Sequence, residues 1–409
     1  MTYPLVRRLG ELLEVKGGKR LPAGTALIGT RTNHPYLRIV DFRDGTIDTS
    51  NLSYVPDDVF PQIRNYTIDS GDIYISIVGT VGLVGRIPPP LHRANLTENA
   101  AKLFAFSPEL DVGYLFQFLR SDAGQSQIKS LTVGSTQPKL ALFRIKDIQL
   151  PLPPLPEQRA IAATLGALDD KIELNRRMNE TLEAMARALF RDWFVDFGPT
   201  RAKMAGTAPY LSDDLWSLFP DRLDADGKPE GWEMRRVEQL LELAYGKALK
   251  ATDRQPGDVP VYGSGGITGS HSEALVSAPS VIVGRKGTVG SLYWEDRPFF
   301  PIDTVFYVRP FVPLTFCYYA LEQMGLNHMN TDAAVPGLNR NNVYRLETAW
   351  SGEALIHAFD NVASVIRVRI KHNSDESRTL AQTRDLLLPR LMSGELRIAQ
   401  AERTLEEVA

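Results

Sequence analysis

The sequence predicts an α+β protein made of two copies of one unit, each a mixed globular region followed by a long helix. Three observations predict it: an internal repeat, short apolar runs between turn residues, and two long heptad patterns. At 409 residues the chain is too long for one ordinary domain. Its 43% hydrophobic and 23% charged residues are the composition of a chain that buries a sizeable core.

The repeat consists of three blocks that keep their order along the chain. Segment 6–21 aligns with 234–249, and eight of the sixteen positions are identical at an offset of 228. The sequence Gly-Thr-Val-Gly occurs at 79–82 and again at 287–290. From Pro138 and Pro336 onward the offset is 198 for more than fifty residues, so the first copy is about thirty residues longer than the second.

Each globular region alternates strand and helix signals. Short β-branched or aromatic runs bounded by turn residues predict strands at 73–78, 281–283 and 305–308. Amphipathic runs predict helices at 114–119 and 316–324. The resulting division is a first globular region over residues 1–154, a central helix 155–198, a linker 199–230, a second globular region over residues 231–352, a distal helix 353–395 and a tail 396–409.

Two helices carry apolar residues at alternating steps of four and three, which is the seam of a coiled coil. Gly198-Pro199 is expected to close the first helix. An antiparallel pairing would bring Asn175 to Ser377 and Asn179 to Asn373, and such mid-seam polar residues fix register. The alternative is that each helix packs only on its own globular region. The first seam is Ile161, Leu165, Leu168, Ile172, Asn175, Asn179, Leu182, Ala186, Leu189 and Trp193; the second is Phe359, Ala363, Ile366, Ile370, Asn373, Ser377, Leu380, Arg384, Leu387 and Leu391, where Arg384 fits poorly.

Motifs for catalysis and cofactors are absent from the sequence. It contains no phosphate-binding P-loop and no H-E-x-x-H zinc motif, and its single cysteine, Cys317, permits neither an intrachain disulfide nor a cysteine-rich zinc site. No run approaches the roughly 18–20 apolar residues that span a membrane. We therefore expect no catalytic residue, no metal, no membrane and a reducing, cytoplasmic location.

Charge alone does not suggest nucleic acid. The net charge is −3, and residues 1–154 carry 17 basic against 14 acidic residues, a surplus of 3. Residues 231–352 carry 11 against 12, a deficit of 1. Neither region has the strongly basic balance of a domain that binds DNA alone.

Two loops of the second copy nevertheless suit DNA. Arg285 and Lys286 precede Gly-Thr-Val-Gly, and segment 338–342 reads Leu-Asn-Arg-Asn-Asn; Arg and Asn are the side chains that pair with guanine and adenine. The first-copy equivalents are 79–82 and 136–139. The alternative is that these are turns needed only by the fold. The predicted DNA contacts are Lys19, Thr80, Gln137, Lys139, Ser264, Arg285, Lys286, Thr288, Asn339, Arg340 and Asn341.

Several segments resemble the target-recognition domains of specificity subunits of type I restriction–modification enzymes. They are Pro-Val-Tyr-Gly-Ser-Gly-Gly at 260–266, Val-Ile-Val-Gly-Arg-Lys-Gly-Thr-Val-Gly at 281–290, Pro-Ile-Asp-Thr at 301–304, Leu-Pro-Pro-Leu-Pro-Glu-Gln at 152–158 and Glu-Gly-Trp at 230–232. The resemblance covers nearly the whole chain. The chain departs from it where the first copy has Ile77-Val78 in place of Arg285-Lys286.

The resemblance implies two target-recognition domains held apart by antiparallel spacer helices, which read a bipartite, asymmetric double-stranded DNA target. It also implies that this chain binds no cofactor. Two methyltransferase subunits using S-adenosylmethionine would dock on it, and restriction subunits using ATP and Mg²⁺ could join them. Two alternatives remain: a coiled-coil scaffold that binds proteins but not DNA, and a solitary DNA-modifying enzyme with an unrecognised site.

Overall fold

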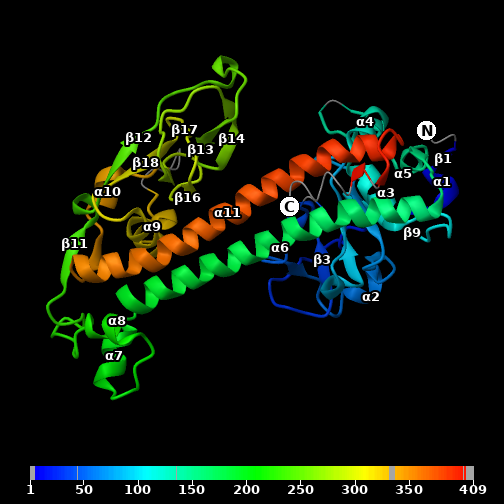
Figure 1. Ribbon diagram of the computed structural model, residues 1–409. Helices are drawn as coiled ribbons and strands as arrows, with labels where there is room; N and C mark the ends of the chain where they lie inside the picture. The colour runs from blue at the N-terminus through cyan, green and yellow to red at the C-terminus, as the bar shows by residue number, and fades with distance from the viewer. Residues whose placement is uncertain (1–4, 44, 135, 331–336, 399, 402–409) are drawn as a thin grey trace. The chain divides into compact units, whose positions relative to one another are not determined.

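The computed structural model describes residues 5–43, 45–134, 136–330, 337–398 and 400–401. It divides into two compact units, of which unit 1 comprises 1–174 with 376–409 and unit 2 comprises 175–375. Two helices of 40 residues, α6 (Leu155–Phe194) and α11 (Glu353–Met392), contribute to both units (Figure 1). Pro336 of the repeat and residues 402–409 of the predicted tail lie outside the described residues.

Unit 1 contains two four-stranded sheets and one two-stranded sheet. The first has the strand order β2-β9-β6-β7 and is antiparallel throughout, and the second has the order β4-β3-β8-β5 with β3 and β8 parallel. Strands β1 and β10 form the two-stranded sheet. The elements before α6 are β1 (Val6–Arg8), α1 (Leu9–Leu12), β2 (Glu14–Gly17), β3 (Pro35–Leu37), β4 (Ser53–Tyr54), α2 (Phe60–Ile63), β5 (Thr67–Ile68), β6 (Ile73–Ser76), β7 (Val84–Arg86), β8 (Ala94–Leu96), β9 (Ala100–Phe104), α3 (Val112–Arg120), α4 (Asp122–Leu131), α5 (Leu142–Ile145) and β10 (Gln149–Pro151).

Unit 2 repeats this topology. The order β12-β18-β15-β16 matches β2-β9-β6-β7, the pair β11–β19 matches β1–β10, and the parallel pair β13–β17 matches β3–β8. The predicted fold class, an α+β protein with an internal repeat and two long helices, is confirmed. The elements are α7 (Gly198–Met204), α8 (Asp213–Ser217), β11 (Glu233–Arg236), β12 (Leu241–Tyr245), β13 (Val259–Gly263), β14 (Gly266–His271), β15 (Ser280–Gly284), β16 (Leu292–Glu295), β17 (Phe300–Pro301), β18 (Val305–Pro310), α9 (Leu314–Gln323), α10 (Arg340–Tyr344) and β19 (Glu347–Trp350).

The different lengths of the two copies have a structural cause. Residues 18–72 connect β2 to β6, which is 55 residues, whereas residues 246–279 connect β12 to β15, which is 34 residues. Most of the surplus in the first copy is therefore inserted between two strands of one sheet. The sheet itself keeps the same strand order in both units.

The central strands β6 and β15 are buried on both faces, which explains why they read as continuous apolar runs. In β6, Ile73 and Ile75 pack toward the helices, while Tyr74 faces the second sheet and donates to the carbonyl oxygen of Arg43 at 3.0 Å. In β15, Val281 and Val283 belong to one core cluster and Ile282 to another.

Helices α6 and α11 run antiparallel within each unit. In unit 1 Asp169 contacts Arg384 at 2.7 Å, and in unit 2 the Asn373 side chain donates to Asn179 Oδ1 at 2.8 Å. Every position of the two seams is buried or half-buried. The predicted contact between Asn175 and Ser377 stays a prediction because these residues belong to different units.

The first long helix ends earlier than the sequence predicts. It stops at Phe194, and Gly198-Pro199 begins the short helix α7 instead of closing α6, because Phe197 adopts a left-handed conformation with φ 54° and turns the chain. The end of α6 is held in an aromatic core. The ring centroids of Trp193 and Phe194 lie 6.2 and 5.5 Å from that of Phe359 on α11.

Candidate nucleic-acid interface

The predicted DNA contacts gather at one end of the four-stranded sheet in each unit. In unit 1 Gly17 pairs with Ala101 and Ser76 with Ala100, so β2 and β6 both end beside the start of β9. The segments that follow them carry Lys19 and the first Gly-Thr-Val-Gly loop. We call this region the sheet-end surface of unit 1, formed by 18–20, 77–82 and 136–139.

Unit 2 has the same arrangement. Tyr245 pairs with Phe306 and Gly284 with Val305, so β12 and β15 end beside the start of β18. The sheet-end surface of unit 2 is formed by 245–247, 264, 285–288 and 337–341. It brings together two loops that the sequence analysis identified separately.

Backbone hydrogen bonds tie those two loops to each other. The amide of Leu338 donates to the carbonyl oxygen of Arg285 at 2.8 Å, and Lys286 forms an antiparallel bridge with Gly337. Ser264 is 6% exposed, and its hydroxyl lies within hydrogen-bond distance of the carbonyl oxygens of Lys286 and Thr304, at 2.6 Å from the latter. The Ser264 side chain, predicted to contact DNA, therefore stabilises the 285–288 loop through the backbone.

Two arginines share one exposed aromatic ring. The guanidinium carbons of Arg285 and Arg340 each lie 4.9 Å from the centroid of Tyr245, whose side chain is 49% exposed. Nη1 of Arg285 donates to the carbonyl oxygen of Asp303 at 3.1 Å, and Nη1 of Arg340 lies 3.4 Å from that of Leu243. Cation–π contacts of about 0.5–1 kcal/mol each orient both forks before any ligand arrives.

Tyr245 was not among the predicted contacts, although the repeat contained a signal for it. Position 245 aligns with Gly17 at the offset of 228, so an exposed aromatic residue stands where the first copy has none. An exposed ring beside cations is a suitable stacking platform for a base or sugar.

The other predicted residues of unit 2 divide into exposed and structural side chains. Lys286, Thr288 and Asn341 are exposed. Asn339 is exposed as well, but it caps α10 by accepting a hydrogen bond from the amide of Asn341 at 2.9 Å. Its carbonyl oxygen is thus used by the fold.

Unit 1 has the same loop geometry with different chemistry. The amide of Leu140 donates to the carbonyl oxygen of Ile77 at 2.9 Å, and Lys139 forms a bridge with Val78. Where unit 2 has Arg285, Tyr245 and Arg340, the repeat positions in unit 1 are Ile77, Gly17 and Leu142. A Cβ built on Gly17 would lie 3.5 Å from Cδ1 of Leu142, so the leucine occupies the place of the second arginine.

The four predicted contacts of unit 1, Lys19, Thr80, Gln137 and Lys139, are all exposed. Nζ of Lys19 lies 5.6 Å from the ring centroid of Tyr66. No arginine pair of the unit 2 type is present among the described residues of this surface. The two surfaces therefore offer different contacts at equivalent positions.

The Gly-Thr-Val-Gly loops also have a structural requirement. Gly79 and Gly82 have φ of 76° and 93°, and Gly287 and Gly290 have φ of 85° and 72°. Only glycine adopts this region without strain. The fold thus explains the glycines, while the side chains beside them differ between the copies.

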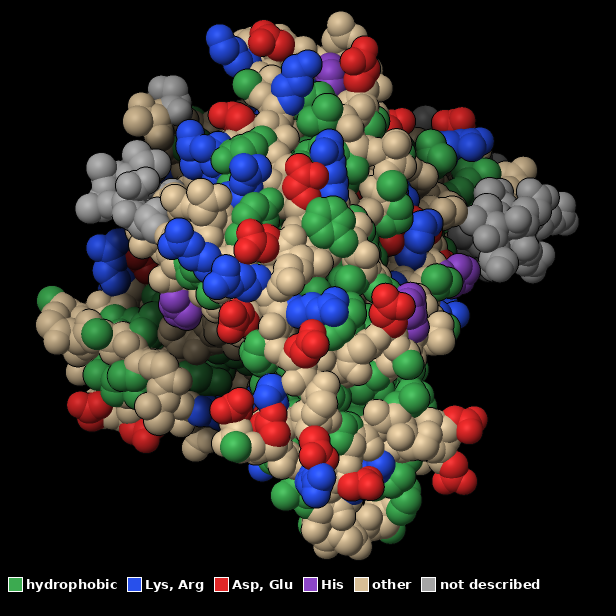
Figure 2. All heavy atoms as spheres, turned by 90° about the vertical axis from the view of Figure 1, so that its left-hand side faces the viewer, with side chains coloured by type: hydrophobic (Ala, Val, Ile, Leu, Met, Phe, Trp, Pro, Cys, Tyr) green, Lys and Arg blue, Asp and Glu red, His purple; other side chains and the backbone are tan. Residues whose placement is uncertain are grey.

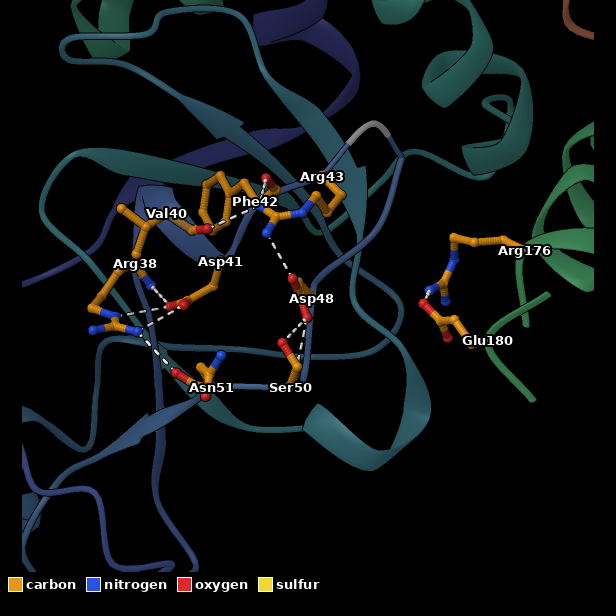
Figure 3. Close-up of polar contacts among 10 residues, drawn as sticks. All are labelled: Arg38, Val40, Asp41, Phe42, Arg43, Asp48, Ser50, Asn51, Arg176 and Glu180. Carbon is orange, nitrogen blue, oxygen red and sulfur yellow. Dashed lines mark hydrogen bonds and ion pairs between the residues drawn. The ribbon is translucent and has the colours of Figure 1, made fainter. Parts of the chain in front are cut away.

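Two arginines of the inserted segment of unit 1, Arg38 and Arg43, form ion pairs within that segment (Figure 3). Arg38 donates from Nη2 to Asp41 at 2.8 Å and to the carbonyl oxygen of Asn51 at 3.0 Å. Arg43 donates to Asp48 at 2.6 Å. These ion pairs organise the connection between β3 and β4 and reduce the positive charge it could offer to phosphates.

Charges of both signs are interspersed over the face shown in Figure 2. This mixture agrees with the net charge of −3. It predicts weak non-specific attraction to DNA, since that attraction depends on phosphate neutralisation by clustered cations.

The described residues offer little for catalysis. Burial raises the pKa of the Cys317 thiol to about 12, so the thiolate is suppressed. Among the residues that the structure describes, no group of three or more His, Cys, Asp or Glu side chains could hold a metal ion. No helix in the described ranges is both long and apolar enough to cross a membrane.

A family model described as "Type I restriction modification DNA specificity domain" matches residues 5–184 and 229–340, which is more than half of the chain and covers most of the globular region of each copy. The chain belongs to this family. Within the DNA specificity family, the HindI specificity subunit of a type I restriction enzyme from Haemophilus influenzae is 26% identical over 356 residues, covering 69% of this chain and 77% of that protein. The MjaIX specificity subunit from Methanocaldococcus jannaschii is 32% identical over 133 residues, covering 32% of this chain and 28% of that protein.

A solved structure of the family shares the fold. The S subunit of the type I restriction–modification system from M. genitalium has a TM-score of 0.53 at 19% identity, covering 95% of both chains. This likeness supports the architecture of the DNA specificity family for the present chain.

Proposed function

We propose that this chain reads a bipartite DNA sequence, with each sheet-end surface contacting one half-site. The observation that carries the proposal is the family match over both copies, combined with loops that are tied in the same way in each unit. Because the side chains on those loops differ, the two half-sites should differ and the target should be asymmetric.

Unit 2 offers contacts suited to both bases and phosphates. Arg285 and Arg340 present planar forks whose donors match the O6 and N7 acceptors of guanine. Lys286 is an exposed point charge at the mouth of the same loop, which suits a phosphate. Thr288 and Asn341 add a hydroxyl and an amide.

Unit 1 should read its half-site with fewer charges. Gln137 carries an amide that can pair with the N6 and N7 edge of adenine, and Thr80 carries a hydroxyl and a methyl group. Lys19 and Lys139 supply the cations. The aliphatic Ile77 and Leu142 cannot replace the arginines of unit 2, so this half-site should lack the guanine contacts proposed there.

The chemistry would belong to partner subunits. Two methyltransferase subunits that hold S-adenosylmethionine are the expected partners, with restriction subunits that use ATP and Mg²⁺ joining in a nuclease complex. The role of this chain would be to position the methylating subunits on the DNA. It would bind the target and hold these subunits where the modified bases lie. A methyl-transfer, ATPase or nuclease reaction by the purified chain alone would contradict this division of roles.

Methylome sequencing tests the proposal most directly. A host with the gene should show a methylated bipartite motif that disappears when the gene is deleted and returns with the wild-type copy. Persistence of every motif after deletion would argue for a scaffold without DNA contact. Specific retention of a degenerate duplex pool by the chain and its methyltransferase partner would exclude that alternative directly.

A further inference from the structure

The contacts that seat each globular region on the two long helices have opposite charges in the two units. Helix α3 carries the contact in unit 1 and α9 carries it in unit 2, and these two helices align at an offset of 202. The alignment is supported by one pair of corresponding contacts between these helices and the long helices, one contact in each unit. Gly113 meets Ala162, since a Cβ built on this glycine would lie 3.0 Å from the alanine Cβ, and the hydroxyl of Thr315 donates to Asp360 at 2.6 Å.

In unit 1 the helix pair supplies a carboxylate to the globular region. Asp169 on α6 accepts from Arg120 at 2.8 Å and from Gln117 at 2.6 Å, both on α3. Its other oxygen accepts from Arg384 on α11 at 2.7 Å. Burial opposes ionisation of Asp169, but Arg120, Gln117 and Arg384 outweigh it and hold the pKa of this carboxyl below its ordinary value.

In unit 2 the helix pair supplies cations. Arg367 on α11, whose side chain is 9% exposed, contacts Glu183 on α6 at 2.8 Å and donates to the hydroxyl of Tyr319 on α9 at 2.9 Å. Glu322 on α9 pairs with Arg187 on α6 at 2.6 Å. The guanidinium of Arg367 also lies 4.5 Å from the ring centroids of two aromatic residues of this unit, Trp294 and Tyr318.

The reversal occurs position by position. Arg120 aligns with Glu322 at the offset of 202, and Asp169 aligns with Arg367 at 198. Arg187 aligns with Asp385, also at 198. Unit 1 therefore has one cation, Arg120, and two anions, Asp169 and Asp385, at these positions. Unit 2 has the opposite charge at each of them, in Glu322, Arg367 and Arg187.

We propose that these charges make the two junctions selective. Each globular region packs on its own segments of the long helices and is repelled by the segments of the other unit. Placed on the helix segments of unit 2, Arg120 would face Arg367 and Arg187. Placed on those of unit 1, Glu322 would face Asp169 and Asp385. Repulsion should be strongest at Asp169 and Arg367, whose side chains are 20% and 9% exposed, and discrimination between similar partners commonly depends on such repulsion.

A chain that contains the same fold twice has a particular need for this discrimination. Misassembly between similar units and exchange of units between two chains are characteristic failures of repeat and multidomain proteins. The aligned buried pair Tyr114 of α3 and Phe316 of α9 gives little discrimination, because both side chains are aromatic and 0% exposed. The charges differ in sign at the neighbouring aligned positions, and so they can distinguish the two junctions.

The test uses the full-length chain and does not depend on DNA binding. Arg120→Glu gives the first globular region the sign of the second, and we expect it to lower the thermal unfolding midpoint of unit 1 by on the order of 5–10 °C. Amide hydrogen exchange should accelerate in α3 and not in α9. Arg64→Glu, an equal charge change at an exposed position of the same unit, should leave both measurements unchanged.

Two further variants separate rejection from a simple loss of contact. Arg120→Gln removes the ion pair without creating repulsion, so its effect should be clearly smaller than that of Arg120→Glu. The triple variant Arg120→Glu, Asp169→Arg, Arg384→Glu reverses every charge of the ion-pair cluster around Asp169 and should recover most of the midpoint and the slow exchange of α3. Equal effects of the Gln and Glu variants, or a triple variant no more stable than Arg120→Glu, would overturn the proposal.

Discussion

Replacing Arg340 by alanine tests whether the sheet-end surface of unit 2 reads a base. The guanidinium lies 4.9 Å from the ring of Tyr245 and 5.6 Å from the ring of Tyr344, so it is ordered before DNA arrives. A well-placed bidentate contact to guanine contributes about 1–3 kcal/mol of discrimination. Arg340→Ala should therefore weaken binding to the preferred duplex roughly 5- to 150-fold. Discrimination should fall at one position of one half-site.

Lys286→Ala supplies the contrasting result. If this exposed side chain meets only a phosphate, its loss should weaken all sequences alike and flatten the salt dependence by about 0.9 in slope. Between 50 and 200 mM salt, a slope change of that size alters the affinity ratio of variant to wild type about 3.5-fold. The assay is competition binding to a randomised duplex library at several salt concentrations, using the chain with its methyltransferase partner.

Arg222→Ala is the matched control, because Arg222 pairs with Glu230 at 2.6 Å outside the sheet-end surface. It should change neither affinity nor specificity. Thermal unfolding must accompany each measurement, since Arg340 also packs on two rings. Wild-type affinity and specificity in both Arg340→Ala and Lys286→Ala would refute the reasoning and leave these residues with a structural role only.

Four other outcomes are expected. Asn179→Leu with Asn373→Leu should raise the unfolding midpoint but permit shifted helix pairing, detectable by cysteine cross-linking. Asn373→Leu alone should cost about 1–3 kcal/mol, because it removes the donor to Oδ1 of Asn179 in the seam. Inserting one heptad at the middle of each long helix should lengthen both by about 10.5 Å, and methylome sequencing should show a gap about three base pairs longer with both half-sites retained; an unchanged gap would contradict the spacer role. The pKa of Asp169 is lowered in the folded state. The carboxylate therefore stabilises unit 1 at pH values above its unfolded-state pKa, and this contribution is lost as the pH falls through the folded-state pKa. Asp169→Asn should make the stability of unit 1 less dependent on acidic pH, as measured by circular dichroism. Cys317 should resist maleimide at pH 7 in the native chain and react after denaturation, and rapid native labelling would show that the α9 region opens.

The architecture was accessible from the sequence because it depends on periodicity. Apolar residues at steps of four and three predicted both long helices, and continuous β-branched runs predicted β6 and β15, since these patterns report local burial. The exact end of α6 was not accessible. It depends on the left-handed turn at Phe197 and on aromatic packing around Trp193, which involve residues distant in the sequence.

The candidate site was only partly accessible for the same reason. Residue type alone predicted Arg285 and Arg340 as contacts, but the contact that both make with Tyr245 requires β12 and β15 to end on the same side of β18. In the sequence, the charged Arg384 fits the apolar seam of the distal helix poorly. Its partner, Asp169, lies 215 positions away in the sequence, and no local pattern could have revealed the pair.

The aromatic core at the end of α6 has a practical consequence for spectroscopy. All five tryptophans of the chain, Trp193, Trp216, Trp232, Trp294 and Trp350, belong to unit 2. Intrinsic tryptophan fluorescence will therefore report the melting of this unit alone, while far-ultraviolet circular dichroism follows both. Superimposed denaturation curves from the two signals would mean that the chain unfolds as one cooperative body, and separated curves would give the stability of each unit without cutting the chain.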